Sequence, residues 1–256
     1  MSIKKRLGDI RHNHIFCGDF PRGIINRALK RFNYQIIPVE FTSAIQYRGL
    51  LFSTDYIDFK IIDEVFKTYY YSDIRPTDIV LDIGAHVGGY TLRIANSVSK
   101  VIAVEPIYYG VLASNVVLNQ LSDKVEILTY ALSSKEELDI QFGHRKAHVC
   151  GKTLTELIEL CGGHIDVLKI DCEGGEWCIT LDELREAKIR RLEGELHAFN
   201  GEDRLKFIHW LEGIGYDVWT DHDDGVVMMF HAQLPNTTNN IIGSMALCAE
   251  SLRHCW

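Results

Sequence analysis

The sequence of 256 residues lacks any long apolar run. A membrane span needs about 18 consecutive apolar residues, and no stretch approaches that length. Residues 1–7 carry positive charge without an apolar segment after them, so we expect no secretory signal. The seven cysteines are scattered and include no Cys-x-x-Cys pair, a pattern that favours reduced thiols in a cytoplasmic protein. Internal repeats and low-complexity runs are also absent.

Length and composition suit a globular protein that has one main domain with additions. Apolar residues make up 46% of the chain and charged residues 24%, as in ordinary soluble proteins. We expect an accessory region at residues 1–55, the main domain at residues 56–235 and a tail at residues 236–256.

Charge is distributed unevenly along the chain. The formal net charge of −8 disfavours the body of the protein as a general nucleic-acid binder. Residues 1–35 nevertheless hold eight basic and two acidic side chains, a net charge of +6 that leaves −14 for the rest. Ile25, Leu29 and Phe32 recur there at helical spacing between basic residues. Such a basic helix can contact an anionic substrate or a membrane surface, but packing of one face on the domain is the favoured interpretation.

Strand and helix patterns alternate through the main domain, which predicts a parallel sheet with helices on both faces. The expected strands are residues 79–83, 100–104, 125–128, 166–170 and 189–196, with extended pieces at 34–39, 50–52 and 138–142. The expected helices are residues 59–70, 90–98, 111–119, 154–160 and 204–211. Thr153 and Glu156 form a capping box before the fourth of these helices. Residues 216–220 and 226–230, joined by a short turn, predict an antiparallel hairpin that closes the sheet.

A glycine-bearing turn follows the first main strand, with the spacing Asp82-x-Gly84-x-His86-x-Gly88. A dinucleotide site requires G-x-G-x-x-G, and an acid two residues before the first glycine would repel a pyrophosphate. This spacing therefore argues against a nicotinamide-dependent oxidoreductase. The acid suits a ligand that presents a cation or hydroxyls, as S-adenosylmethionine does. His86 stands where methyltransferases usually have their middle glycine, and histidine tolerates the positive φ that this turn needs.

Glu105 ends the next strand, 23 residues after Asp82, where an acid can hold the two hydroxyls of a ribose. Pro106 turns the chain away directly afterwards. The glycine turn or the acid alone is weak evidence for a binding site, because a surface acid often ends a strand. Together the glycine turn and the acid indicate a nucleoside-bearing cofactor.

A second dense group of polar residues surrounds the end of the fourth strand. Lys169 and Asp171 share one face of that strand, and Glu173 follows among glycines. In an open α/β sheet ligands bind beyond the carboxyl ends of the strands, so this group indicates a site rather than a core. Glu195 and His197 share a face of the next strand, and His197 is a candidate general base or a structural histidine.

These motifs, in this order, resemble the FkbM-type S-adenosylmethionine-dependent methyltransferases over roughly residues 60–200. The resemblance is carried by residues 82–91, 104–106, 115–119 and 195–197, and most specifically by Lys169-Ile170-Asp171-Cys172-Glu173-Gly174-Gly175-Glu176. It implies a Rossmann-like class I methyltransferase fold, with a mostly parallel seven-stranded sheet, helices on both faces and an antiparallel final strand. It also implies O-methylation of a hydroxyl on a sugar, glycan or other natural product.

The resemblance also implies roles for individual residues. Asp82, Gly84 and Ala85 would lie against the amino-acid end of the cofactor, with His86, where the family usually has asparagine, and Gly88 in the same turn. Glu105 would hold the ribose beside Pro106, and Tyr130 and Ala131 would lie near the adenine. The basic arm and the tail fall outside the match, and substrate choice is expected there.

The methyl group of a sulfonium is already activated, so the enzyme mainly aligns the acceptor oxygen and can remove its proton. Asp171 or His197 is the expected base, with Lys169 and Glu173 as orienting groups. A variant of this mechanism places a divalent cation on Asp171, Glu173 and neighbouring oxygens, but no metal is favoured, since carboxylate clusters more often make hydrogen bonds. Two alternatives stay open: an RNA methyltransferase that uses the basic arm on phosphates, and a cofactor-binding module without activity.

Overall fold

A computed structural model describes residues 34–39, 42–56, 59–69 and 73–235. The basic helix predicted around residues 25–32 and the tail at residues 236–256 lie outside these residues. The described strands are β1 (Tyr34–Val39), β2 (Thr42–Tyr47), β3 (Leu50–Ser53), β4 (Ile79–Ile83), β5 (Lys100–Val104), β6 (Val125–Leu128), β7 (Ala131–Leu132), β8 (Glu137–Phe142), β9 (Arg145–Lys152), β10 (Val167–Ile170), β11 (Arg191–His197), β12 (Asp217–Asp223) and β13 (Val227–Gln233). The described α-helices are α3 (Phe59–Thr68), α4 (Gly89–Ile94), α5 (Tyr109–Leu118), α6 (Leu154–Leu160), α7 (Leu181–Ala187) and α8 (Arg204–Gly213).

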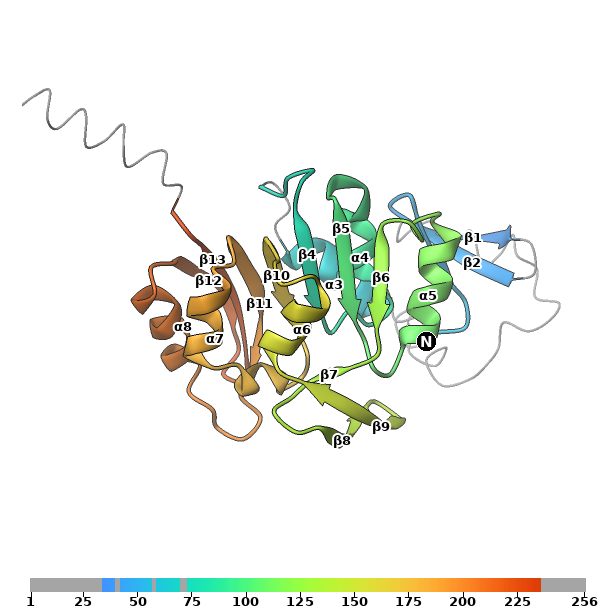
Figure 1. The fold of residues 1–256 in the computed structure, drawn as a ribbon. Coiled ribbons are helices and arrows are strands. Elements are labelled where there is room, and N and C mark those ends of the chain that lie inside the picture. The colour runs from blue at the N-terminus through green and yellow to red at the C-terminus, as the bar shows by residue number, and fades with distance from the viewer. Residues whose placement is uncertain (1–33, 40–41, 57–58, 70–72, 236–256) are drawn as a thin grey trace, which may run out of the picture.

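A seven-stranded sheet forms the centre of the molecule (Figure 1), with the order β12-β13-β11-β10-β4-β5-β6. Strands β11, β10, β4, β5 and β6 pair in parallel, whereas β13 runs antiparallel to both of its neighbours. The parallel strands β4, β5 and β10 consist mostly of apolar residues because both of their faces are covered. This arrangement confirms the predicted fold class, including the antiparallel last strand.

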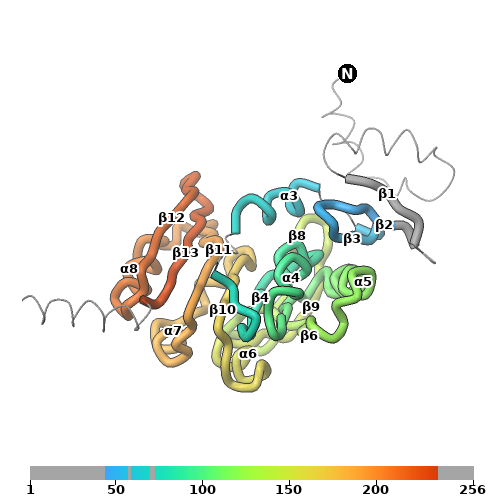
Figure 2. The backbone as a smooth tube through the Cα atoms, turned by 90° about the horizontal axis from the view of Figure 1, so that it is seen from above, coloured from blue at the N-terminus to red at the C-terminus, as the bar shows by residue number. Residues whose placement is uncertain are grey.

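Helices cover both faces of this sheet (Figure 2), and each face has its own hydrophobic cluster. Side chains of β4 alternate between the two clusters: Val80 joins the one under α4 and α5, and Leu81 joins the one under α6, α7 and α8. The alternation follows from the two-residue period of a strand. At roughly 25 cal/mol for each Å² of apolar surface removed from water, these two clusters dominate the stability of the fold.

The segment before the main domain forms a small antiparallel sheet, β1-β2-β3, which is anchored on α5. The side-chain oxygen of Asn115 accepts the backbone N–H of Ser53 at 2.6 Å, and its amide donates to the carbonyl of Val87 at 2.8 Å. Asn119 pairs with both backbone groups of Leu51. The domain boundary at residue 55 stays a prediction, and the strands just before it pack on the main domain.

Four of the described strands and α-helices were not expected from the sequence: β2, β7, β9 and α7. Strand β9 pairs with β8 to form a hairpin that projects from one edge of the molecule (Figure 1), and the sequence analysis found only the β8 half of this pair. Helix α7 begins at a second capping box, in which Thr180 and Glu183 bond reciprocally. The same Thr-x-x-Glu signature that located α6 would have located α7. None of the described helices has the length and apolar character needed to cross a membrane.

Candidate active site

The glycine turn after β4 packs directly against the end of β10. Gly84 has a φ of +79°, and a Cβ there would lie 1.7 Å from the carbonyl oxygen of Asp171. Only glycine therefore fits this position, for reasons of both conformation and space. His86 adopts a φ of +51°, as the sequence analysis expected, and Gly88 a φ of +91°. The contact brings the turn and the Asp171 group into one site.

Lys169 lies beneath this turn with only 2% of its surface exposed. Its ammonium group donates to the carbonyl of Gly84 at 2.9 Å, and it lies 3.2 Å from Asp82 and 3.6 Å from Asp171. Burial by itself would lower the pKa of Lys169, but these two carboxylates raise it above its ordinary value. Asp82 is fully buried and also accepts the hydroxyl of Thr91 at 2.5 Å. Both side chains thus support the turn from below.

Glu105 links the ends of β4 and β5. One of its oxygens accepts the backbone N–H groups of Ile107 and Tyr108, and the other accepts that of His86 at 2.8 Å. Burial raises the pKa of the Glu105 carboxyl above its ordinary value, and the three backbone donors oppose this shift. The acid at the end of β5 therefore shapes the glycine turn as well as being available to a ligand.

Aromatic rings surround His86 at this end of the sheet. Its ring centroid lies 5.4 Å from that of Tyr56, 4.6 Å from that of Tyr108 and 5.4 Å from that of Phe142. Arg145 stacks over Tyr108, and it comes with Phe142 from the β8–β9 hairpin. The hairpin that the sequence only half predicted thus covers the glycine turn with an aromatic group.

Two further residues expected at the cofactor lie after β6. Tyr130 is partly buried in the cluster on the α6 face, and Lys152 stacks over its ring. Ala131 lies in β7 and pairs with Gly151 of the hairpin strand β9. Pro106, between Glu105 and Ile107, occupies the turn that follows β5.

His197, the last residue of β11, is held in one orientation by Glu176. The Glu176 carboxylate is fully buried; one oxygen contacts both the backbone N–H and Nδ1 of His197, at 2.6 and 2.9 Å. The other oxygen accepts the backbone N–H of Gly174 at 2.9 Å and faces the thiol of Cys172. Trp177 donates its indole N–H to the carbonyl of His197 at 2.7 Å. The short 3-10 helix at Gly175–Cys178 supplies two of these partners.

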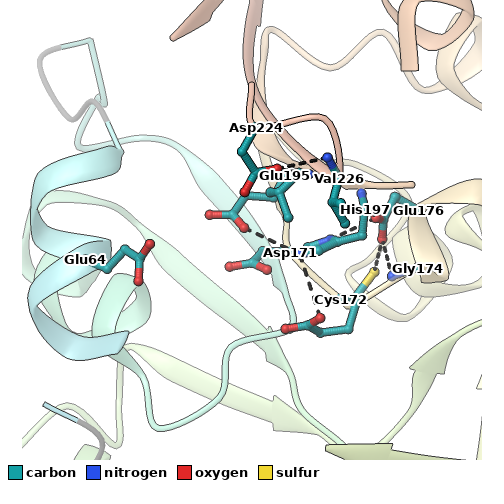
Figure 3. Close-up of polar contacts among 12 residues, drawn as sticks. Glu64, Asp171, Cys172, Gly174, Glu176, Glu195, His197, Asp224 and Val226 are labelled. Atoms are coloured by element: carbon teal, nitrogen blue, oxygen red, sulfur yellow. Dashed lines mark hydrogen bonds and ion pairs between the residues drawn. The ribbon is translucent and has the colours of Figure 1, made fainter. Parts of the chain in front are cut away.

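The other ring nitrogen of His197, Nε2, faces carboxylates (Figure 3). It lies 3.4 Å from Glu195 and 3.8 Å from Glu173. One ligand-capable atom from each of Asp171, Glu195 and His197 lies within 4.8 Å of the other two. Tyr69 donates its hydroxyl to Asp171 at 3.1 Å. Adjacent ends of β10 and β11 thus bring together an imidazole and three carboxylates.

Burial and hydrogen bonds shift the pKa values of the side chains in this cluster. Burial by itself would lower the pKa of His197, but hydrogen bonds to Glu176 and Glu195 raise it to about 10. Burial raises the pKa of Glu195 and of Glu173 above their ordinary values. At neutral pH the isolated cluster therefore contains an imidazolium, which has no lone pair to act as a base. The side chain of Asp171 beside it is partly exposed.

The structure brings together nearly all of the residues expected at the site, at the carboxyl ends of β4, β5, β10 and β11. Sequence analysis missed three contributors: Tyr69, Glu176 and Glu195. Glu195 shares a strand face with His197, and Glu176 lies inside the most specific motif, so both carried a signal in the sequence. Tyr69 gave none, because its place at Asp171 depends on how α3 packs.

No protein-family model and no curated protein matches the chain. Solved structures resemble it only distantly. Precorrin-6y C5,15-methyltransferase from Geobacter metallireducens is 13% identical, with coverage of 69% of this chain and 88% of that one and a TM-score of 0.45. TYW2 from M. jannaschii in complex with AdoMet is 17% identical, with 77% and 89% coverage and a TM-score of 0.44. Magnesium protoporphyrin IX methyltransferase from Synechocystis PCC 6803 with bound SAM is 12% identical, with 69% and 77% coverage and a TM-score of 0.42.

Proposed function

We propose that the protein is an S-adenosylmethionine-dependent methyltransferase of the FkbM type. One observation carries this proposal: the acid at the end of β5 binds the backbone of the acid-x-Gly turn at the end of β4, through Glu105 and His86 at 2.8 Å. The hydrogen bond joins the carboxylate proposed to bind the ribose to a turn in which only glycine fits at position 84. A pyrophosphate would meet the Glu105 charge here, whereas the hydroxyls of a nucleoside can donate to it.

In this proposal the cofactor lies along the carboxyl ends of β4 and β5. The ribose hydroxyls donate to Glu105, which has accepting capacity left on the oxygen that binds His86. The methionine end follows the Gly84–Gly88 turn, with Ala85 in contact and with Asp82 acting from below through Lys169. Tyr130 and Ala131 border the adenine. Because the Gly84 turn packs on Asp171, the methyl group would be directed toward the acid cluster.

The chemical step needs alignment more than activation. A lone pair of the acceptor oxygen forms the new O–CH3 bond as the S–CH3 bond breaks, and the electron pair of the broken bond stays on sulfur. The hydroxyl proton passes to a carboxylate, for which Asp171 is the candidate base, because His197 is held as an imidazolium in the isolated cluster. Glu173 orients the acceptor, and its side chain is 45% exposed.

The acceptor that suits this site is a polyhydroxyl compound, such as a sugar, a glycan or another natural product. Asp171, Glu173 and Glu195 offer acceptors to several hydroxyl groups. Phe199 is 54% exposed and lies 5.3 Å from the ring of His197, so it offers an apolar face for a sugar ring. The same carboxylates would repel the phosphates of RNA, which disfavours an RNA methyltransferase. The basic arm that favoured RNA lies outside the described residues.

The first test is calorimetric titration of the full-length protein with S-adenosylhomocysteine, with NAD as the control ligand. We expect saturable binding of S-adenosylhomocysteine alone, and at least about a tenfold loss of affinity in Glu105→Gln. The single amide oxygen of glutamine cannot accept both the His86 N–H and the N–H groups of Ile107 and Tyr108. Glu126→Gln is the matched control, since Glu126 is an exposed acid on the neighbouring strand, paired with Lys100. A folded protein that does not bind S-adenosylhomocysteine would refute the proposal.

A second measurement separates catalysis from binding alone. Transfer of labelled methyl groups from S-adenosylmethionine to mixed glycans, small polyols and RNA identifies the acceptor class. We expect incorporation into a hydroxyl compound, with loss in Asp171→Asn. Incorporation into RNA with steep salt dependence would instead favour the nucleic-acid alternative. Cofactor binding without transfer to any acceptor would favour the non-catalytic module.

A further inference from the structure

We propose that Asp171, Glu195 and His197 form a binding site for one divalent cation. The binding site itself follows from the geometry of these three side chains, and only its role in catalysis rests on the proposed methyltransferase function. The sequence analysis favoured no metal and, in its variant mechanism, placed a cation on Asp171 and Glu173. The structure points to a different set of ligands, in which Glu195 and an imidazole replace Glu173.

The parallel pairing of β10 and β11 produces this set. Ile170 lies opposite Gly194 in the register, so the next residues, Asp171 and Glu195, leave the sheet side by side. His197 comes two residues later on the same face as Glu195. One donor atom of each side chain lies within 4.8 Å of the other two. Donors bound to a common ion at about 2.1 Å are about 3 to 4 Å apart, so small rotations of the carboxylates complete the site.

A second, independent feature is the way in which His197 is held. Fully buried Glu176 contacts Nδ1 at 2.9 Å, and both of its oxygens are occupied by further protein donors. In this contact Nδ1–H donates to Glu176, so Nε2 is directed at the two carboxylates, and a bound cation would displace the Nε2 proton. Ligating histidines in proteins characteristically donate their other ring N–H to a carboxylate in this way. An acidic cluster alone would not need such a buried orienting group.

The donor set defines the class of cation. One imidazole and two carboxylates suit Mn²⁺, Fe²⁺ or Zn²⁺ better than Mg²⁺ or Ca²⁺, which prefer oxygen alone. Asp171 and Glu195 are only partly buried, so other coordination positions face the open side of the cluster. An acceptor hydroxyl bound there would have its pKa lowered by the cation. With Asp171 on the cation, Glu173, 3.8 Å from Nε2, would replace Asp171 as the group that takes the hydroxyl proton during methyl transfer.

Binding of Mn²⁺ to the full-length protein tests the site without any turnover. Electron paramagnetic resonance counts free Mn²⁺, and electron spin echo envelope modulation detects a coordinated nitrogen. We expect one ion per chain with a Kd of about 100 μM or tighter, and ¹⁴N modulation from His197. Asp171→Asn and Glu195→Gln should each weaken binding by at least about tenfold, and His197→Gln should also abolish the nitrogen signal.

Glu64→Gln is the matched control, because Glu64 lies across from the cluster on α3 (Figure 3) and is not a proposed ligand. Equal weakening by Glu64→Gln and Glu195→Gln would show diffuse attraction and overturn the proposal. Saturable binding without ¹⁴N modulation, or no binding to a protein whose circular dichroism shows it folded, would do the same. Titration with S-adenosylhomocysteine on the same samples separates the two proposals. If the protein binds S-adenosylhomocysteine but not Mn²⁺, only the metal site is refuted. If it binds Mn²⁺ but not S-adenosylhomocysteine, only the methyltransferase function is refuted.

Discussion

Replacement of Lys169 by methionine should strongly destabilise the protein. Lys169 is 2% exposed and Asp82 is fully buried, and their charged atoms lie 3.2 Å apart. Methionine fills a similar volume but leaves the Asp82 carboxylate charged, buried and without its cation. The change also removes the 2.9 Å hydrogen bond to the Gly84 carbonyl. The glycine turn should therefore loosen together with the loss of stability.

The expected magnitude follows from the burial of this pair. Removal of one partner of a buried ion pair costs about 3 to 5 kcal/mol of unfolding free energy, because the other charge stays behind without compensation. For a chain of this size, each kcal/mol lowers the melting temperature by about 2 to 4 °C, so a fall of about 6 to 20 °C is expected. Lys100→Met is the matched control: its pair with Glu126 is about half exposed, and such surface pairs contribute about 0 to 1 kcal/mol.

Urea unfolding followed by circular dichroism measures both variants. The double variant Lys169→Met/Asp82→Asn removes both charges and should recover at least half of the loss, because a neutral buried pair avoids the uncompensated charge. A loss in Lys169→Met no larger than that in Lys100→Met would refute this account of Lys169. So would a double variant that is less stable than the single one.

Three further predictions concern the hairpin, the thiols and a helix cap. A hydrogen bond to Asp139 raises the pKa of His148 above its ordinary value, which an NMR titration should detect. The variant Asp139→Asn should lower the pKa of His148 again. Because His148 lies in β9 and Asp139 in β8, the contact between the two strands weakens as the pH rises through the pKa of His148. Burial raises the pKa of Cys161 to about 11, so iodoacetamide at neutral pH should modify exposed Cys150 much faster; equal rates would contradict this. Thr180→Ala should cost about 1 kcal/mol in urea unfolding, and an unchanged midpoint would argue against the cap.

Local sequence signals located most of the main domain. Strands β4, β5 and β6 have the bounds that the sequence predicted, because each consists mostly of apolar residues. The start of helix α6 was predicted from its capping box. The small strand β2 and the second hairpin strand β9 were missed, since their polar and apolar residues alternate weakly. Their place depends on partners distant in the sequence.

Side-chain roles were harder to predict than positions. The sequence placed Lys169 among the catalytic candidates, because a lysine beside acids at a strand end indicates chemistry. The structure finds it beneath the glycine turn, in contact with Asp82 and the Gly84 carbonyl. Alternation along β10 gives the face of Lys169, but only the packing of the turn decides whether that face is open or covered. The roles of Asp171, Glu173 and His197 stay predictions.

The sequence by itself determined most strands and helices of the main domain, the acid-x-Gly turn and the acid at the end of β5, because apolar periodicity and glycine positions are local properties. The tertiary structure alone decided what His197 faces. Glu176 reaches it across 21 residues of sequence, and Asp171 arrives from a neighbouring strand. Contacts of that kind depend on the register between β10 and β11 and on the packing of a 3-10 helix, and no local pattern encodes either. The chemistry of this protein therefore depends on pairings that exist only once the sheet has formed.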